Sequence, residues 1–242
     1  MQAQVQTRPA ASHRGALDRV PPRGGAGTIR LAPPVAELDA LEMIGVLRKF
    51  HRGQGIYAEG DPADYCFRVE TGSVRTVGLD DEGRRQIADF FLPGDLLGFE
   101  SLGVHHLSAE AITDTELRCY PRRAVDLLAE KDCALGRRLH DMALRSLRRA
   151  HGKMFLLGRA SAGERIAAFL LEMAVRAPTD GGQVQLPMTR ADIADHLGLT
   201  IETVSRIMAR LGRDGVIAAT KHGVEIRSRK VLSRFGSSTA RH

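Results

Sequence analysis

The chain has 242 residues, of which 43% are hydrophobic and 26% charged, a composition typical of a globular protein with one or two packed domains. No apolar run approaches the roughly 20 residues of a membrane helix, and no apolar signal segment follows the amino terminus, so the sequence predicts a cytoplasmic protein without a membrane partner. The three cysteines, Cys66, Cys119 and Cys133, show no CxxC spacing, which argues against a disulfide framework and against a metal site built on cysteine.

The net charge of +6 is unevenly distributed along the chain. Acidic side chains dominate residues 35–120, whereas residues 1–34 and 121–242 carry an excess of basic ones. A basic C-terminal half favours a polyanionic partner such as nucleic acid, although a solvated basic face would give the same pattern. The charge pattern therefore predicts two parts with different tasks and leaves their partners open.

The N-terminal half divides into an arm and a β-rich domain. Residues 1–34 are rich in Pro, Gly, Ala and Arg and follow no helical or strand period, so we expect a disordered arm. Residues 35–121 are punctuated by glycines, and strand-like segments lie between them at 66–70, 73–77 and 87–91. Short strands with regular turn signals predict an antiparallel sandwich or barrel.

Residues 122–158 show the apolar spacing of a long helix. Apolar residues recur at alternating intervals of four and three, with arginines beside them. A narrow stripe of this kind is typical of a two-stranded coiled coil and predicts a homodimer, although a helix packed on its own domain would also explain it. The predicted dimer interface comprises Leu135, Leu139, Met142, Ala143, Leu147, Ala150, Met154 and Leu157.

Residues 159–228 contain the pattern of a winged helix-turn-helix. A predicted helix over 190–197 is followed by Gly198, which can adopt the positive φ of a tight turn, and Thr200 is suited to cap a second helix. The expected small core of the motif comprises Ile193, Leu197, Leu199, Val204, Ile207 and Leu211, and the small Ala194 allows the two helices to approach.

A β-hairpin is expected after the second helix. Strand-like segments near 214–217 and 223–226 flank Lys221, and a further strand candidate lies at 183–186. This hairpin would form the wing and present Lys221 to a phosphate, while residues 229–242 would be a tail.

Three residues near the start of the second helix are suited to reading bases. Glu202, Ser205 and Arg206 are spaced at i, i+3 and i+4 and therefore share one face. Arginine can donate two hydrogen bonds to guanine, and a carboxylate can accept one from cytosine. The alternative is a surface ion pair between Glu202 and Arg206, and both interpretations can hold together. The predicted phosphate contacts are Thr189, Arg190, Thr200, Thr203, Arg210, Arg213 and Lys221.

Over roughly residues 35–228 the sequence resembles the Crp/Fnr superfamily of bacterial transcription regulators. Its Gly-Asp-Leu-Leu-Gly segment at 94–98 is similar to the family's roll signature, and the helix-turn-helix pattern matches as well. The resemblance implies an α+β fold: an antiparallel β-roll of the cyclic-nucleotide-binding type, a long dimerisation helix and a winged helix-turn-helix. It also implies double-stranded DNA, a second copy of the chain and RNA polymerase as partners.

The residues around the reading face resemble one branch of this superfamily. Cyclic-AMP-responsive members carry Arg before the recognition Glu and Gly before the recognition Arg, where this chain has Ile201 and Ser205. The Glu-x-x-Ser-Arg pattern instead resembles the Fnr/FixK branch, which reads palindromes of the TTGAT-N4-ATCAA type. The resemblance implies an activator of genes for low-oxygen respiration, denitrification or nitrogen fixation.

The family's usual effectors are not expected here. Cyclic-AMP binders place Glu after the roll glycine and an Arg-Ser pair in the next strand, where this chain has Phe99 and Leu107-Ser108. Fnr holds an iron–sulfur cluster through a cysteine at the Cys119 position and three N-terminal cysteines, but residues 1–65 contain none. We therefore expect a FixK-like regulator without a cofactor, with Cys119 as a buried strand cysteine.

Other functions are weighed against this interpretation. His105 and His106 suggest a haem-binding or otherwise ligand-gated sensor, although adjacent histidines in a loop are more often simple polar residues. No Walker, GxSxG or HExxH motif supports an enzyme. A charged hairpin in the roll is either a contact for RNA polymerase or an ordinary turn; its residues are Asp80, Asp81, Glu82, Arg84 and Arg85.

Overall fold

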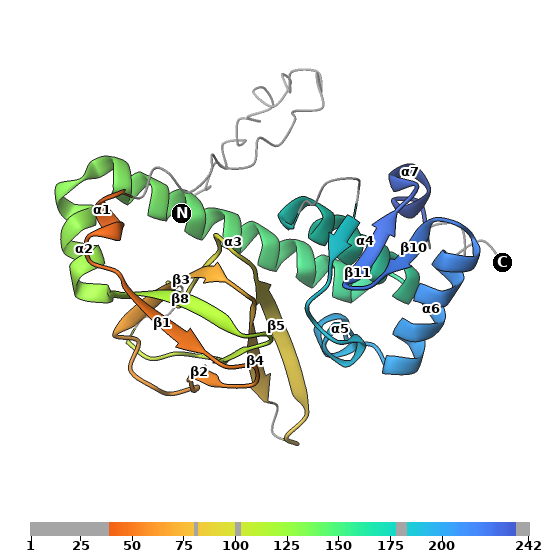
Figure 1. Ribbon diagram of the computed structural model, residues 1–242, viewed down its shortest axis with the longest axis horizontal. Coiled ribbons are helices and arrows are strands. Elements are labelled where there is room, and N and C mark those ends of the chain that lie inside the picture. The colour runs from red at the N-terminus through yellow and green to blue at the C-terminus, as the bar shows by residue number, and fades with distance from the viewer. Residues whose placement is uncertain (1–38, 80–81, 100–102, 178–182, 236–242) are drawn as a thin grey trace, which may run out of the picture. The chain divides into compact units, whose positions relative to one another are not determined.

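The computed structural model describes residues 39–79, 82–99, 103–177 and 183–235 (Figure 1). The arm expected over residues 1–34 lies outside the described residues. Within these ranges, no helix is long and apolar enough to cross a membrane. In the same ranges, no group of three or more His, Cys, Asp or Glu side chains is arranged to hold a metal ion.

Two four-stranded antiparallel sheets follow the short helix α1 (Asp39–Glu42), and we call them the roll. The strands expected at 66–70, 73–77 and 87–91 are confirmed as β3, β4 and β5. The first sheet has the order β1 (Val46–Phe50), β8 (Thr115–Pro121), β3 (Tyr65–Thr71) and β6 (Leu96–Leu97). The second has the order β2 (Gly55–Tyr57), β7 (Ser108–Ala111), β4 (Val74–Leu79) and β5 (Arg85–Phe91).

Alternating side chains of these strands fill the interior of the roll. Phe67, Val69, Val74 and Leu117 are buried together there, and Cys119 of β8 joins them, as the sequence predicts. Burial raises the pKa of the Cys119 thiol, so this cysteine remains protonated and inert.

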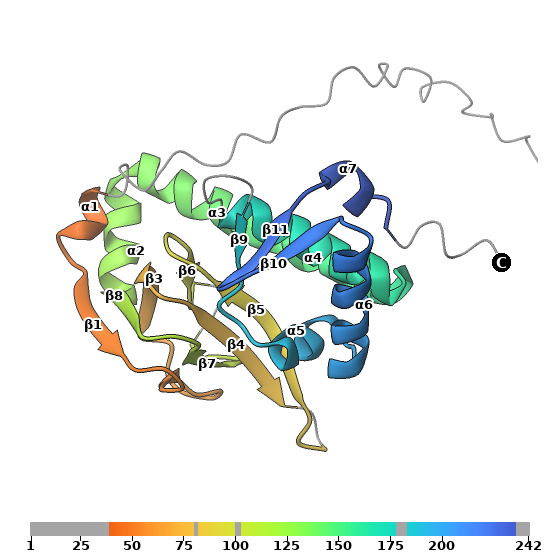
Figure 2. The same ribbon diagram turned by 45° about the vertical axis from the view of Figure 1, so that its right-hand side comes forward.

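The helical stretch that follows the roll is divided into α2 (Arg122–Lys131) and α3 (Cys133–Arg159). Asp132 lies between them in an extended conformation, and its side chain accepts hydrogen bonds from the first amides of α3. The expected helix over 122–158 is therefore two helices, because a capping aspartate interrupts it. The 27 residues of α3 span about 40 Å, and α3 passes the roll and continues to the C-terminal helices (Figure 2).

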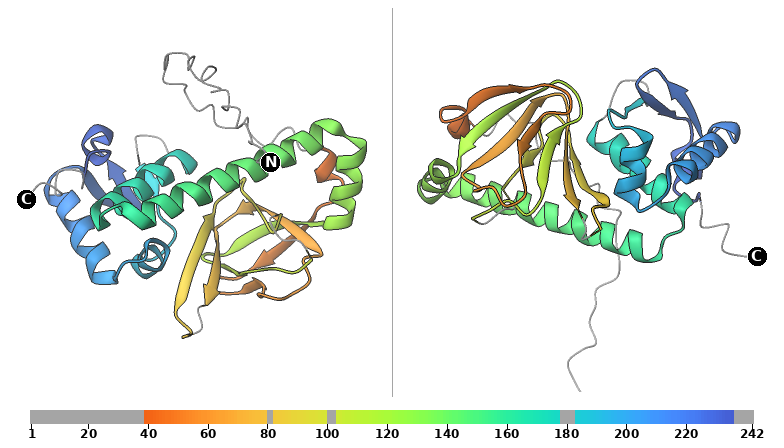
Figure 3. Two further views of the ribbon diagram at one scale, coloured as in Figure 1. Left: turned by 180° about the vertical axis from the view of Figure 1, so that it is seen from behind. Right: turned by 90° about the horizontal axis from the view of Figure 1, so that it is seen from below.

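In the C-terminal part, the described residues 162–177 and 183–235 form four helices and a three-stranded antiparallel sheet. Figure 3 shows this part from two further sides. The wing contains a third strand, β9, at the position of the strand candidate near 183–186, and the sheet order is β10-β11-β9. Residues 229–232, expected in the tail, form α7, and Leu232 is buried. The elements are α4 (Ala162–Arg176), β9 (Gln183–Gln185), α5 (Arg190–Leu197), α6 (Ile201–Arg213), β10 (Ile217–Thr220), β11 (Gly223–Ile226) and α7 (Arg229–Leu232).

The hydrophobic core of the C-terminal part continues into the roll. Ile87 and Phe90 of β5 belong to the same buried cluster as Ile166 and Phe169 of α4. The rings of Phe90 and Phe169 meet edge to face, with centroids 6.1 Å apart. The second sheet of the roll therefore packs directly against the helices that carry the helix-turn-helix.

Candidate nucleic-acid interface

The two helices of the predicted motif are α5 and α6, and local chemistry determines where each begins. Thr189 caps α5 in a reciprocal capping box with Asp192. Gly198 ends α5 in the left-handed conformation, with φ 61°. Thr200 then caps α6 by accepting a hydrogen bond from the amide of Thr203. The sequence-based assignments of the turn at Gly198 and of the cap at Thr200 agree with these positions, whereas the cap at Thr189 was not predicted.

Apolar residues beneath the two helices hold them at a fixed angle. Ile193, Leu197, Val204 and Leu211 are buried, as expected, and the buried Ala194 gives α6 room to approach α5. Leu199 and Ile207, also expected in this core, are only partly buried at its edge. The motif is therefore a rigid support for the surface residues of α6.

The surface of α6 near its N-terminus carries the predicted reading residues. Glu202 and Arg206 are exposed and Ser205 is half-buried. Glu202 and Arg206, both within the described ranges, form no ion pair with each other; a guanidinium nitrogen of Arg206 lies 3.5 Å from the hydroxyl of Thr203 instead. The backbone amide of Glu202 and the hydroxyl of Thr200 lower the pKa of the Glu202 carboxyl, which therefore remains an ionised acceptor. The surface ion pair offered as the alternative interpretation is thus absent.

The predicted phosphate-contacting residues lie at the start of α5, along α6 and in the wing. Arg190 donates a hydrogen bond to the hydroxyl of Ser205, at 3.3 Å, and so joins the start of α5 to α6. Arg210 lies 3.7 Å from Asp214 and above the ring of Phe235. Lys221 lies in the turn between β10 and β11, where the wing was expected. The exposed members of the set are Thr189, Arg190, Thr200, Arg210, Arg213 and Lys221, and Thr203 is half-buried.

Helix α3 presents only part of its apolar stripe to solvent. Leu135 is 2% exposed and belongs to a buried cluster with Leu41 and Tyr120 of the same chain, so it is unavailable to a partner. Leu147 and Met154 are 51% and 60% exposed. Of the remaining predicted interface residues, Leu139, Met142 and Leu157 are half-buried and Ala143 and Ala150 exposed. Sequence reasoning missed Leu144 and Phe155, two further exposed apolar residues of this helix.

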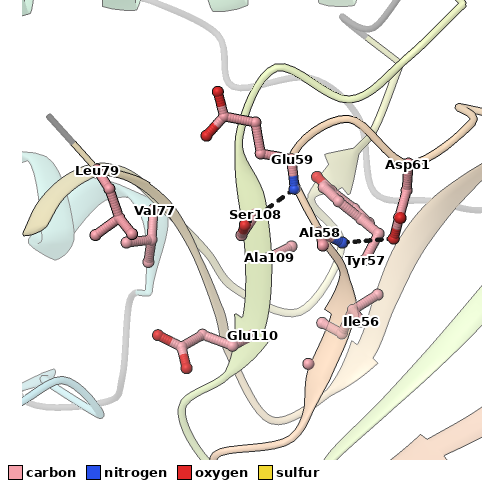
Figure 4. Close-up of a pocket in the computed structure, with 11 residues that line it drawn as sticks. Ile56, Tyr57, Ala58, Glu59, Asp61, Val77, Leu79, Ser108, Ala109 and Glu110 are labelled. Atoms are coloured by element: carbon pink, nitrogen blue, oxygen red, sulfur yellow. Dashed lines mark hydrogen bonds between the residues drawn. The ribbon is translucent and has the colours of Figure 1, made fainter. Parts of the chain in front are cut away.

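A groove of about 510 Å³ lies in the roll beside β2, β4 and β7. Figure 4 shows the carboxylates of Glu59, Asp61 and Glu110 among its lining residues, with Asp61 accepting a hydrogen bond from the amide of Ala58. Ser108, which follows Leu107, accepts a hydrogen bond from the amide of Glu59 at 3.0 Å. None of the described residues that line the groove is basic.

The histidine pair of the roll is divided between core and surface. His105 is buried and its ring stacks on Tyr57, with centroids 3.6 Å apart, whereas His106 is exposed. Burial lowers the pKa of His105, with a smaller contribution from the charge of Arg122. Phe99, at the position of the nucleotide binders' carboxylate, packs against an apolar cluster with Tyr120.

The charged hairpin predicted to contact RNA polymerase is only partly described, because Asp80 and Asp81 lie outside the described residues. Glu82 and Arg84 are exposed and form an ion pair of 3.0 Å. Arg85 instead turns towards α5, where it binds Asp195 at 2.8 Å. Sequence reasoning missed this contact, since no local pattern pairs residues 110 positions apart.

Comparison with known proteins finds two matching families and several relatives. Residues 47–132 match the cyclic nucleotide-binding domain and residues 164–235 the Crp-like helix-turn-helix domain. The chain is 45% identical over 166 residues to the nitrogen fixation regulation protein FixK of Rhizobium meliloti (strain 1021), covering 69% of this chain and 75% of FixK. It is 36% identical over 189 residues to the transcriptional activator protein FnrL of Cereibacter sphaeroides, covering 75% of this chain and 76% of FnrL. The solved structure of FixK2 from Bradyrhizobium japonicum matches with a TM-score of 0.75 and 42% identity over 78% of this chain and 96% of that one.

Proposed function

We propose that this chain, which belongs to the Crp/Fnr family of transcription regulators and to its FixK-like members, is a DNA-binding activator. In this proposal it binds TTGAT-N4-ATCAA-type palindromes as a homodimer and activates the adjacent genes. Its relatives are regulators and not enzymes. The name of the FixK relatives, nitrogen fixation regulation protein, supports target genes for nitrogen fixation. Genes for low-oxygen respiration or denitrification and a cytoplasmic location are part of the same proposal.

The observation that carries this proposal is the reading face of α6. Glu202 offers an ionised acceptor, Ser205 a small hydroxyl and Arg206 an exposed guanidinium near the N-terminus of the second helix. In a helix-turn-helix, this part of the second helix enters the major groove. Arg206 can bind guanine O6 and N7, and Glu202 can accept a hydrogen bond from cytosine N4. The surrounding basic residues then fix the position on the DNA backbone.

A homodimer is the second part of the proposal, and the exposed part of the α3 stripe supports it. Leu147 and Met154 are separated by one heptad, and Leu144 and Phe155 widen the apolar surface beside them. Exposed apolar surface of this extent on a long helix is typical of a partner interface. A palindromic site requires two reading helices related by a two-fold axis, which a parallel pair of α3 helices supplies.

Binding without cyclic nucleotide is the third part. Glu59 and Asp61 line the roll groove and would repel a cyclic phosphate. Leu107 offers the phosphate no guanidinium, and Phe99 offers the ribose no carboxylate. The groove itself favours the alternative of a sensor gated by some other small molecule. The ring of His105 is buried and stacked on Tyr57, which argues against its binding haem iron. An absorbance spectrum after addition of haem tests the haem-gated alternative, because bound haem would give a Soret band.

RNA polymerase contact through the roll hairpin remains a proposal for Glu82 and Arg84, together with Asp80 and Asp81. Arg85 is engaged with α5 and is less available to a second protein. An in vitro transcription assay with alanine at Glu82 and Arg84 tests it, with unchanged DNA binding as the required control.

The decisive experiment is fluorescence anisotropy of the purified protein in air, without ligand and at fixed salt. One duplex carries TTGAT-N4-ATCAA, and a second carries both half-sites altered. Tight binding to the first duplex alone supports a regulator that needs neither cluster nor nucleotide. Weak or equal binding to both contradicts the proposal and directs the search to a ligand of the roll.

A further inference from the structure

Charged side chains of the roll meet the first helix of the helix-turn-helix. Arg75 of β4 donates to a carboxylate oxygen of Asp192 at 2.6 Å, and Arg85 of β5 reaches the same oxygen at 3.0 Å. Arg85 also binds the carboxylate of Asp195, and the side-chain amide of Gln86 donates to its carbonyl at 2.6 Å. We call these five residues the roll–α5 seam.

The ion pair between Arg75 and Asp192 is the buried part of the seam, whereas Arg85 and Asp195 are about one third exposed. The side chain of Asp192 is 2% exposed and that of Arg75 is 16% exposed, so both charges have left bulk water. The cost of desolvating such a pair offsets most of its attraction, so the net gain in stability is small. An unpaired buried carboxylate is strongly unfavourable, however, so α5 is held where both arginines reach Asp192.

The carboxylate of Asp192 also links the seam to the reading helix. One oxygen accepts from the backbone amide and hydroxyl of Thr189 and so starts α5, while the other oxygen receives both arginines. The neighbouring Arg190 contacts Ser205 of α6. The position of the reading face therefore follows the position of Asp192.

A second joint connects the same helix to α3. The ammonium group of Lys153 donates to the carbonyls of Ile87 and Ala88 in β5, at 3.1 and 2.7 Å, and lies 2.9 Å from Nδ1 of His196 in α5. One side chain thus joins α3, the roll and α5. If α3 carries the dimer axis, this joint and the seam determine the distance between the two reading helices.

The docked face of α5 is not the face that reads DNA. Asp192, Asp195 and His196 meet the roll, whereas Glu202 and Arg206 of α6 are exposed. A contact that blocked DNA binding would cover the reading residues, so this docking is compatible with bound DNA.

We propose that Arg75 and Arg85 are positioning residues for DNA recognition: from the roll they hold α5, and through it α6, at the separation that the two half-sites of a palindrome require. The inference rests on the proposed function, because it presupposes a dimer on palindromic DNA. Each added base pair moves one half-site by about 3.4 Å and rotates it, so a rigid dimer distinguishes spacer lengths sharply.

The test measures affinity for palindromes whose spacer is one base pair shorter than N4, equal to it, or one and two longer. The proteins are the full-length wild type, Arg85→Ala, Arg85→Lys and the control Lys49→Ala. Lys49 belongs to an ion pair with Glu116 on the far sheet of the roll, so its substitution removes a similar charge away from the seam. Sedimentation at the same concentrations establishes that each protein is a dimer.

Arg85→Ala is expected to bind the preferred spacer about tenfold more weakly and to lose most of its preference among spacers. Its preference for intact over altered half-sites should persist, because α6 is unchanged. Arg85→Lys keeps one ion pair and should lie between wild type and Arg85→Ala; it carries the test if Arg85→Ala fails to fold. Lys49→Ala should behave as wild type.

Two results would overturn the proposal. In the first, Arg85→Ala and Arg85→Lys show the same dependence of affinity on spacer length as wild type. In the second, these variants bind more tightly than wild type, which would mean that the seam holds the reading helix away from its DNA-binding position. Failure of the wild type to select the palindrome would instead refute the proposed function. The two failures are thus distinguishable in one experiment.

Discussion

Protonation of His196 in α5 should cost the protein a large part of its stability. The ring lies against Phe90 and Phe169, with centroids 4.9 and 5.8 Å away, and Nδ1 faces the ammonium group of Lys153. Nδ1 lies 2.9 Å from this ammonium group and 3.2 Å from the carbonyl oxygen of Ile87. Because an ammonium group only donates, the charge of Lys153 favours the neutral ring in which Nδ1 accepts. Burial, followed by the charge of Lys153, lowers the pKa of His196 from 6.5 to about 4, against an opposing contribution from Asp89.

The direction of the effect on the free energy of unfolding follows from this shift. Between pH 6.5 and about 4, the unfolded chain binds a proton at His196 that the folded chain excludes. The contribution is therefore complete above pH 6.5 and is lost as the pH falls towards 4. Lowering the pKa from 6.5 to about 4, at about 1.4 kcal/mol per pH unit, amounts to roughly 3–4 kcal/mol, a large share of the 5–15 kcal/mol typical of a folded protein.

The assay is urea unfolding followed by circular dichroism, in steps from about pH 7.5 to about pH 4.5. His196→Gln removes the titrating group but keeps an oxygen that can accept from Lys153. It should cost about 1–3 kcal/mol at neutral pH, and the deficit should shrink towards acid pH as wild type loses the His196 contribution. The control is His222→Gln, an exposed histidine of the wing, which should follow wild type at every pH.

A constant deficit of His196→Gln across the whole range would refute this reasoning, because acid loss would then arise from other groups. A second measurement isolates the role of Lys153. In Lys153→Met the positive charge is gone, so NMR titration of His196 should give a pKa closer to its ordinary value.

Three further predictions concern DNA binding, dimerisation and the turn. Arg206→Ala should lose about 1–3 kcal/mol of discrimination at the guanine of each half-site. Lys221→Ala should instead weaken binding to all sequences and reduce the slope of log affinity against log salt concentration by about one. Competition anisotropy at several salt concentrations separates the two effects. Leu147→Asp should dissociate the dimer in sedimentation, whereas Leu127→Asp, at an equally exposed leucine of α2, should not. Gly198→Ala should destabilise the protein by roughly 1–2 kcal/mol in urea unfolding, because its φ of 61° strains any residue with a Cβ; a deficit near zero would contradict that account.

The parts of the site that could be predicted are those determined by neighbouring residues. The caps at Thr189 and Thr200 and the turn at Gly198 depend on hydrogen bonds and φ angles within four positions, so their residue types are sufficient signals. The break between α2 and α3 at Asp132 could also have been predicted, because aspartate is a strong N-cap residue. The apolar spacing on both sides of Asp132 is continuous, however, and so predicted one uninterrupted helix.

The parts that could not be predicted depend on residues distant in sequence. Leu135 fits the apolar stripe of α3 as well as Leu147 does, and only the packing of Leu41 and Tyr120 shows that one is core and the other surface. The pairing of Asp192 with Thr189 in the capping box follows from their spacing of three residues. No neighbouring residue in the sequence indicates that Arg75, 117 positions away, donates a hydrogen bond to the other carboxylate oxygen of Asp192.

In the proposal above, the roll positions α5 through Arg75 and Arg85 without binding a ligand. Arginine stays charged throughout the physiological pH range, so loss of a proton from Arg75 or Arg85 does not break their contacts with Asp192. If the seam holds the reading helix as proposed, DNA binding needs no ligand, and we expect activity to follow the amount of dimer. Transcription in vitro should then rise with protein concentration in step with dimer formation, with the same promoter selectivity at every concentration. A further rise on addition of cyclic AMP at saturating dimer would show instead that the roll retains a ligand-dependent step.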